Sequence, residues 1–150
     1  MTLTQSLTTV GLATALSIGA LYVYHSPGRT AVPAAEATFR CDVASITDGD
    51  TLRCADGTRV RLHAVAARES DGSCRQSHPC PAASAEDATA LLTKLASGQT
   101  ITCQQTGTSY GRKAAICSNE SGVEINCEMV RSGLTLAWQK YADQHPLCGG

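Results

Sequence analysis

The chain has 150 residues, with 12 basic and 13 acidic side chains and a formal net charge of −1. This length favours a single domain with a modest hydrophobic core, and the sequence has no repeat or low-complexity tract. The balanced charge excludes a bulk electrostatic attraction to nucleic acid or to an anionic membrane. Any phosphate binding must therefore come from a few placed arginines.

The first 28 residues contain no Asp, Glu, Lys or Arg, and residues 10–24 form a nearly unbroken apolar run. The length of this run lies between that of a signal-peptide core and that of a full membrane span. Residues 1–28 are therefore predicted to be either a cleaved signal peptide or an uncleaved membrane anchor. We slightly favour the anchor, although residues 35–37 (Ala-Glu-Ala) offer a late cleavage site. Residues 29–38 are predicted to be a linker.

All eight cysteines follow this segment, and such an even set is typical of a disulfide-stabilised exported protein. A cytosolic zinc site is the alternative, but the closest cysteines, Cys74 and Cys80, are too far apart for the usual zinc spacing. Arg29 and Arg40 argue against export by the positive-inside rule, and we give the cysteines more weight. We expect a protein anchored on the periplasmic side of a membrane, or secreted. The sequence does not determine the pairing; our assignment is Cys41 with Cys54, Cys74 with Cys80, Cys103 with Cys117, and Cys127 with Cys148.

The region after the linker begins with three short strands joined by two turns. Alternating apolar and polar residues predict strands at 40–46, 51–54 and 59–65. Glycine and aspartate predict the turns, at 48–50 and at 56–57. We expect these strands to form a meander.

A loop and a helix follow the meander. Residues 68–82 contain Gly, Ser, Pro and two cysteines, which predict a loop. Ser84 followed by Asp87 is close to a capping box and marks the start of a helix, which Gly98 ends. The side chains predicted to form its buried face are Ala88, Leu91, Leu92 and Leu95.

Two further strands are predicted at 99–103 and 113–117, with a polar loop at 104–111 between them. Short helices at 124–132 and 134–142 complete the domain, which we place at residues 39–148. Three meander strands, a helix, two strands and terminal helices are the order of a small five-stranded Greek-key barrel with helices packed on it. The predicted fold class is therefore α+β, mainly β.

Four charged side chains have a spacing that suits the chemistry of phosphodiesters. They are Asp50 in the first turn, Arg61 in the third strand, Glu69 in the next loop and Arg112 beside the last strand. Taken singly, each of these residues is more commonly a turn residue or a solvated surface charge. Together they have a shared logic, because guanidinium groups bind the charge of the transition state and a carboxylate orients the attacking water. A hard cation held by aspartate would neutralise the phosphate.

Three of the following five segments carry these residues: ITDGDTLR, GTRVRL followed by Glu69, LLTKLASGQ, SYGRKAA and INCEMVRSGL. In this order they resemble the staphylococcal nuclease-like, or thermonuclease, family over about residues 39–141. The resemblance implies a five-stranded oligonucleotide-binding (OB) barrel with three helices and calcium-dependent hydrolysis of DNA and RNA.

The resemblance also implies roles for single residues. Asp50 would bind the metal, with Asp48 and Thr51 supporting the acidic turn. Arg61 and Arg112 would bind phosphate, and Glu69 would act as the catalytic carboxylate through water. Tyr110 would flank the bound nucleotide.

The sequence departs from this family at the second metal-binding aspartate. Where the family reads R-L-x-G-I-D-A-P-E, this chain reads R-L-H-A-V-A-A-R-E, which places Ala66 at the aspartate and Arg68 at the proline. The backbone carbonyl of Ala67 can still serve as a ligand beside Asp48 and Asp50. A calcium site nevertheless loses affinity when an anionic ligand is removed.

The aspartate that precedes Tyr-Gly-Arg in the family is also absent. Asp48 or Asp71 are candidates to replace the lost carboxylate, and Arg68 is a candidate to replace part of the cation's charge. His63 is expected to be a barrel or surface histidine rather than a metal ligand.

We therefore expect an exported, monomeric nuclease that acts on DNA, RNA or both and has an altered calcium site. If residues 1–28 are not cleaved, they would attach the protein to a membrane. The alternative is a catalytically impaired OB barrel that binds nucleic acid or another phosphorylated ligand.

Overall fold

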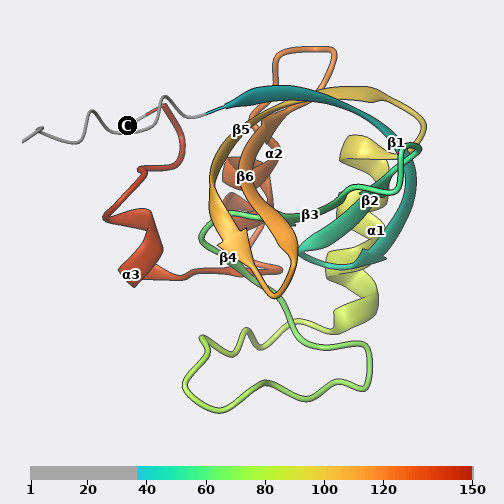
Figure 1. Ribbon diagram of the computed structural model, residues 1–150. Coiled ribbons are helices and arrows are strands. Elements are labelled where there is room, and N and C mark those ends of the chain that lie inside the picture. Colours follow the sequence, from blue (N-terminus) through green and yellow to red (C-terminus); the bar gives the residue numbers. More distant parts are fainter. Residues whose placement is uncertain (1–36, 150) are drawn as a thin grey trace, which may run out of the picture. The chain divides into compact units, whose positions relative to one another are not determined.

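The computed structural model describes residues 37–149, and the predicted leader at 1–28 and nearly all of the linker lie outside them (Figure 1). Five strands close into a barrel in the order β1-β2-β3-β6-β5. Their bounds are β1 (Thr38–Asp48), β2 (Thr51–Cys54), β3 (Arg59–Leu62), β5 (Thr100–Ser109) and β6 (Arg112–Ser118). Neighbouring strands are antiparallel except β3 and β6, whose parallel pairing completes the barrel.

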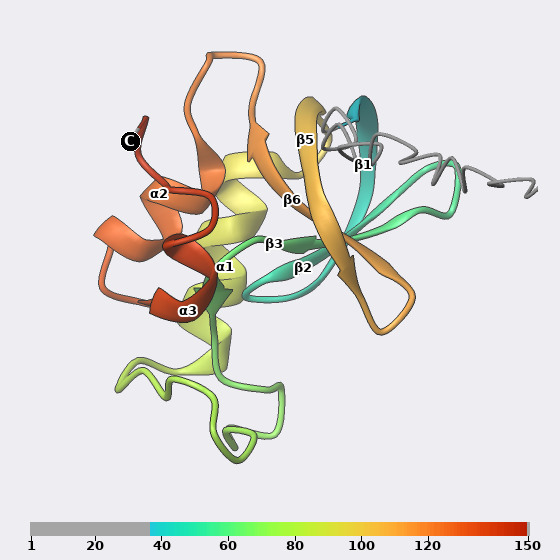
Figure 2. The ribbon, with the colours of Figure 1, turned by 60° about the vertical axis from the view of Figure 1, so that its left-hand side comes forward.

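Three helices complete the described part of the chain: α1 (Ala85–Ala96), α2 (Ile125–Arg131) and α3 (Gln139–Ala142). Figure 2 shows them gathered on one side of the barrel. The protein thus has the expected α+β class, a closed five-stranded barrel with helices that is consistent with an OB-like fold. Within residues 37–149, no helix is long and apolar enough to cross a membrane.

Helix α1 begins and ends where the sequence predicts. The Ser84 hydroxyl accepts a hydrogen bond from the Asp87 N–H at 3.0 Å, which caps the first turn. Gly98 follows the helix with φ of 70°, a conformation that favours glycine. Ala88 and Leu92 are fully buried as predicted, while Leu91 and Leu95 are only partly buried.

The predicted strand at 59–65 is wrong at its end. Ala64 has φ of 55°, which breaks the strand after Leu62. The chain resumes as β4 (Val65–Ala66), which pairs with β7 (Leu136–Ala137) in a separate two-stranded sheet. This pairing also explains why the predicted helix at 134–142 is wrong over most of its length, since only Gln139–Ala142 is helical.

The predicted loop at 104–111 is also wrong, because β5 continues through Ser109. Its backbone pairs with β6 from Thr102 opposite Ser118 to Ser109 opposite Arg112. The polar side chains that suggested a loop are mostly exposed or half-buried along this strand. Polar composition here reflects the outer surface of a barrel rather than the absence of a strand.

The four disulfides are the four pairs assigned from the sequence. Cys41–Cys54 joins β1 to β2, and Cys103–Cys117 joins β5 to β6. Cys74–Cys80 closes a ring within the loop between β4 and α1. Cys127–Cys148 ties α2 to the end of the described chain. No cysteine is free.

Candidate functional site

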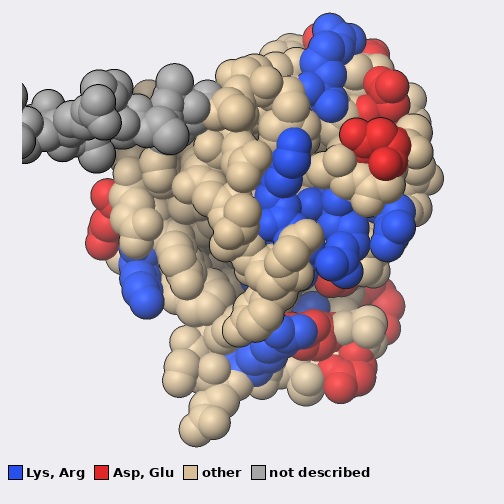
Figure 3. All heavy atoms as spheres, viewed as in Figure 1, with Lys and Arg blue, Asp and Glu red and all other residues tan. Residues whose placement is uncertain are grey.

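A pocket of about 210 Å³ opens where β3, the β5–β6 hairpin, the loop between β4 and α1 (residues 67–84, the β4–α1 loop) and the segment before α3 meet. Its lining includes three arginines, Arg61, Arg75 and Arg112. Aromatic side chains also line it, namely Tyr110, Trp138 and Tyr141. Figure 3 shows basic side chains gathered on this face, with acidic side chains beside them. The pocket therefore combines guanidinium groups with aromatic rings.

The acidic turn between β1 and β2 is a turn, as predicted, and it is packed against helix α1. The Asp48 carboxylate accepts a hydrogen bond from the Asp50 N–H at 3.0 Å. A Cβ at Gly49 would lie 2.6 Å from the Cβ of Ala88 and 2.8 Å from that of Ala67. Only glycine fits this approach, so the turn is held firmly in place.

Asp50 and Arg61 lie in one site, as predicted, but they bind each other. Arg61 Nη1 donates to Asp50 Oδ1 at 2.7 Å, and the Thr51 hydroxyl donates to the same oxygen at 2.9 Å. The Ala67 N–H donates to Oδ2 at 3.3 Å. Both oxygens of this carboxylate therefore accept hydrogen bonds. The residue Asp50 is only 4% exposed.

The residues expected to hold calcium are engaged by other partners in this structure. Calcium takes about six to eight oxygen ligands, usually with several carboxylates. Here Asp50 is already paired with a guanidinium, position 66 is a buried alanine, and the Asp48 carboxylate accepts from backbone. The described residues contain no cluster of three acidic, His or Cys side chains able to hold a metal. Calcium binding through Asp48, Asp50 and the Ala67 carbonyl stays a prediction for a titration to decide.

Arg112 has only neutral partners among the described residues. Its Nη1 donates to the Thr51 hydroxyl at 3.2 Å, and its Nε donates to the Ser109 carbonyl at 3.2 Å. None of the ion pairs within residues 37–149 includes it. Burial and the neighbouring Arg61 charge lower the pKa of Arg112 from its usual value. A half-buried guanidinium without a counterion is well suited to receive an anion.

Glu69 does not line the pocket but is joined to it through Arg75. Its carboxylate accepts from Arg75 Nε at 2.8 Å, with the Glu69 side chain 35% exposed. Tyr110 does line the pocket, is 81% exposed and has φ of 49° at the tip of the β5–β6 hairpin. A bulky residue held in this left-handed region is uncommon and often marks a functional position.

Sequence reasoning missed Arg75, His78 and the place of Trp138. The His78 ring lies 4.2 Å from that of Trp138, which lies 4.9 Å from that of Tyr141. Burial, followed by the charges of Arg61 and Arg75, lowers the pKa of His78. The loop sequence has no periodicity that would indicate these neighbours.

His63 is a satisfied barrel histidine, as predicted. It is buried, its Nε2 lies 3.0 Å from the Tyr141 carbonyl, and its Nδ1 lies 2.8 Å from the Thr106 hydroxyl. Arg68 points into the β4–α1 loop, where it donates to the carbonyls of Gly72 and Pro81 at 2.8 and 2.9 Å. These contacts make Arg68 an anchor of the loop rather than a replacement for the cation.

The stability of the fold is expected to fall between about pH 4 and pH 6 because of Asp50. Burial raises the pKa of the Asp50 carboxyl from 3.8 to about 6, and the attraction to Arg61 offsets only part of this. Between these two values the folded protein holds a proton on Asp50 that the unfolded chain has released. The contribution of Asp50 to the free energy of unfolding is therefore fully present below pH 3.8 and is lost as the pH rises through about 6. The loss is on the order of 3 kcal/mol.

Urea unfolding of the wild type and of Asp50→Asn between pH 4 and pH 8 measures this effect. In Asp50→Asn, the free energy of unfolding is expected to lose this dependence on pH. The loss of the ion pair with Arg61 would lower that free energy by a similar amount at every pH. Glu86→Gln, at an exposed carboxylate on α1, serves as the control and should keep the wild-type slope. An unchanged slope in Asp50→Asn would assign the pH dependence to other groups.

No protein-family model and no curated protein matches this sequence.

Proposed function

We propose that the protein binds the phosphodiester backbone of nucleic acid in this pocket and hydrolyses it. The observation that carries the proposal is Arg112, a half-buried guanidinium with neutral partners, in the same pocket as Arg61. Two guanidinium groups in one pocket match the geometry of a phosphate and become more favourable as negative charge grows in the transition state.

Glu69 is the proposed catalytic carboxylate. It pairs with Arg75, which lines the pocket, and its partial exposure gives it access to water. Once Arg75 turns toward a bound phosphate, the carboxylate is released to orient a water for attack on phosphorus. Breaking the P–O bond then yields a phosphomonoester and an alcohol.

The aromatic side chains suit the bases of a single strand. Tyr110 presents an exposed ring at the hairpin tip, and Trp138 also lines the pocket with the His78 ring against it. Stacking on such rings tolerates any base and contributes about 1–3 kcal/mol per base. This arrangement favours a single-stranded or locally opened substrate.

Membership of the staphylococcal nuclease-like family, with export by residues 1–28, is part of the same proposal. Its support is the order of the five matching segments, the closed barrel and the four disulfides. A second candidate function is binding without hydrolysis. It is favoured by the ion pairs that engage Asp50 and Glu69.

Hydrolysis of single-stranded DNA and RNA by the purified full chain, with calcium or with EDTA, tests the proposal. Arg112→Gln and Glu69→Gln are each expected to lower kcat/KM by roughly 100-fold, as for the loss of one group that stabilises a transition state. Arg40→Gln, at an exposed residue of β1, is the control. Activity indifferent to both pocket variants would overturn the proposal, and binding without turnover would favour the second candidate.

A further inference from the structure

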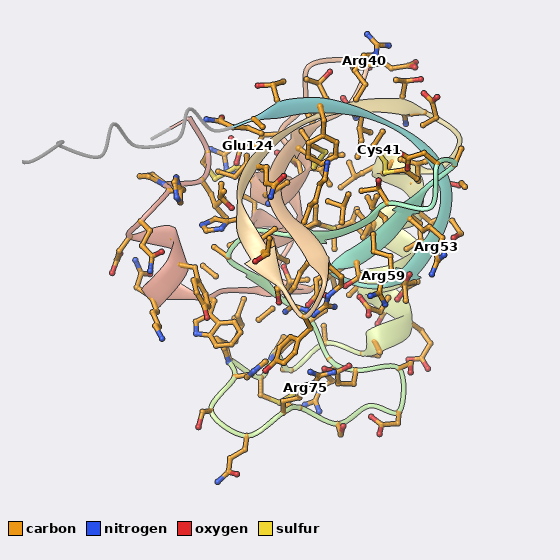
Figure 4. All side chains as sticks on the ribbon, viewed as in Figure 1. Arg40, Cys41, Arg53, Arg59, Arg75 and Glu124 are labelled. Atoms are coloured by element: carbon orange, nitrogen blue, oxygen red, sulfur yellow. A yellow bond between two sulfur atoms is a disulfide. The ribbon has the colours of Figure 1, made fainter. Side chains whose placement is uncertain are left out.

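We infer that Arg75 is a third phosphate-binding group of this pocket and that, with Arg61 and Arg112, it allows a nucleic-acid phosphate to bind without a divalent cation. The inference rests on the proposed function, and it names the charge that takes the place of the metal. In Figure 4, Arg75 lies on the β4–α1 loop, below the barrel.

The loop that carries Arg75 is a built element rather than a loose connection. The Cys74–Cys80 disulfide closes a ring around residues 75–79. Arg68 clamps both limbs of the loop through the carbonyls of Gly72 and Pro81. Within the ring, the His78 N–H donates to the Arg75 carbonyl at 3.0 Å. The backbone of Arg75 is therefore fixed before any ligand arrives, which lowers the entropic cost of binding.

The side chain of Arg75 keeps most of its binding capacity. Its Nε donates to Glu69, which uses one of the five N–H donors of the guanidinium. The guanidinium carbon lies 6.0 Å from the centre of the Tyr110 ring, and the side chain is 52% exposed. It therefore faces the solvent side of the pocket, where a strand passing Tyr110 would place a phosphate.

The charges around the pocket favour an anion over a cation. Three arginines and no Asp or Glu are among the described residues that line the pocket. Asp50 pairs with Arg61 and Glu69 pairs with Arg75, whereas Arg112 has no direct ion pair and feels only the more distant charges of Asp50 and Asp48. Position 66, which would bring a further carboxylate to a metal, is a buried alanine. A cation entering here would meet guanidinium groups, whereas a phosphate would relieve their mutual repulsion.

Fluorescence anisotropy of the full chain with a labelled phosphorothioate oligothymidylate, which resists hydrolysis, tests the inference at fixed salt. The dissociation constant of the wild type is expected to differ by no more than about twofold between EDTA and calcium. In EDTA, Arg75→Gln is expected to weaken binding about tenfold, with Arg75→Lys in between. Glu69→Gln is expected to tighten binding severalfold, because it removes the carboxylate that competes for Arg75.

Arg40→Gln is the matched control, since Arg40 lies at the opposite end of the barrel in Figure 4 and is exposed. Binding that requires calcium, or Arg75→Gln binding like Arg40→Gln, would overturn the inference. Arg112→Gln separates this failure from that of the proposed function. If Arg112→Gln binds weakly and Arg75→Gln binds normally, only the role of Arg75 is wrong; if Arg112→Gln also binds normally, the pocket is not the nucleic-acid site.

Discussion

Replacing Asn126 by leucine is expected to lower the free energy of unfolding by about 4 kcal/mol. One buried N–H would lose its acceptor, at about 1–3 kcal/mol, and two carbonyls would each lose one donor, at about 0.5–1.5 kcal/mol. Asn126 is fully buried on α2. Its Oδ1 accepts from the Cys117 N–H at 2.9 Å, and its Nδ2 donates to the carbonyls of His63 and Ala115 at 3.0 Å each. The Ala115 carbonyl keeps a second donor, the His63 N–H at 2.8 Å.

The chain offers a matched control in Asn119. Its Oδ1 accepts from the N–H groups of Ser121 and Val123, in a turn where water can replace it. Asn119→Leu is expected to cost about 1 kcal/mol. Denaturant unfolding of both variants under oxidising conditions measures the difference. If both variants lose the same free energy of unfolding, the buried hydrogen bonds of Asn126 contribute no more than those of Asn119.

Removing the Cys103–Cys117 disulfide by a double change to alanine is also expected to cost about 4 kcal/mol. The two cysteines are 14 positions apart, a loop whose closure is worth about 3 kcal/mol. Both residues are fully buried between β5 and β6, so the lost sulfur contacts add about 1 kcal/mol. Melting temperature and denaturant midpoint report the loss.

The Cys74–Cys80 pair is the comparison for this experiment. Its cysteines are only 6 positions apart, in a loop outside the barrel, and the same relation gives about 2 kcal/mol. Removing Cys74–Cys80 is therefore expected to lower the free energy of unfolding less than removing Cys103–Cys117 does. The reverse order would mean that the β4–α1 loop contributes more to stability than the barrel disulfide does.

Features with a local physical cause could be predicted from the sequence. The turn at Asp48-Gly49-Asp50, the Ser84 cap and Gly98 after α1 depend on residues within a few positions of one another. The disulfide pairs match our assignment, although the sequence does not determine them; three of them join neighbouring elements or close a short loop. In contrast, Leu136–Ala137 becomes a strand because of Val65–Ala66, a partner that no local pattern reveals.

The candidate site was predicted in part for the same reason. Asp50, Arg61 and Arg112 were expected to lie together, and the structure brings them within hydrogen-bond reach of each other or of Thr51. The pairing of Glu69 with Arg75 could not be predicted, because it depends on the path of a disulfide-closed loop. Calcium binding by Asp48, Asp50 and the Ala67 carbonyl stays a prediction, since position 66 is an alanine in this chain.

The parallel pairing of β3 with β6 has a consequence for the order of folding events. This seam places the strand of Arg61 beside the strand that begins with Arg112. Each disulfide spans at most 21 positions, and none crosses the seam. Oxidation can therefore run ahead of barrel closure, which requires the slower meeting of distant segments. A titration of free thiols would then count a chain as folded before its barrel has closed. Binding of a phosphate ligand would instead detect only molecules in which β3 and β6 have paired.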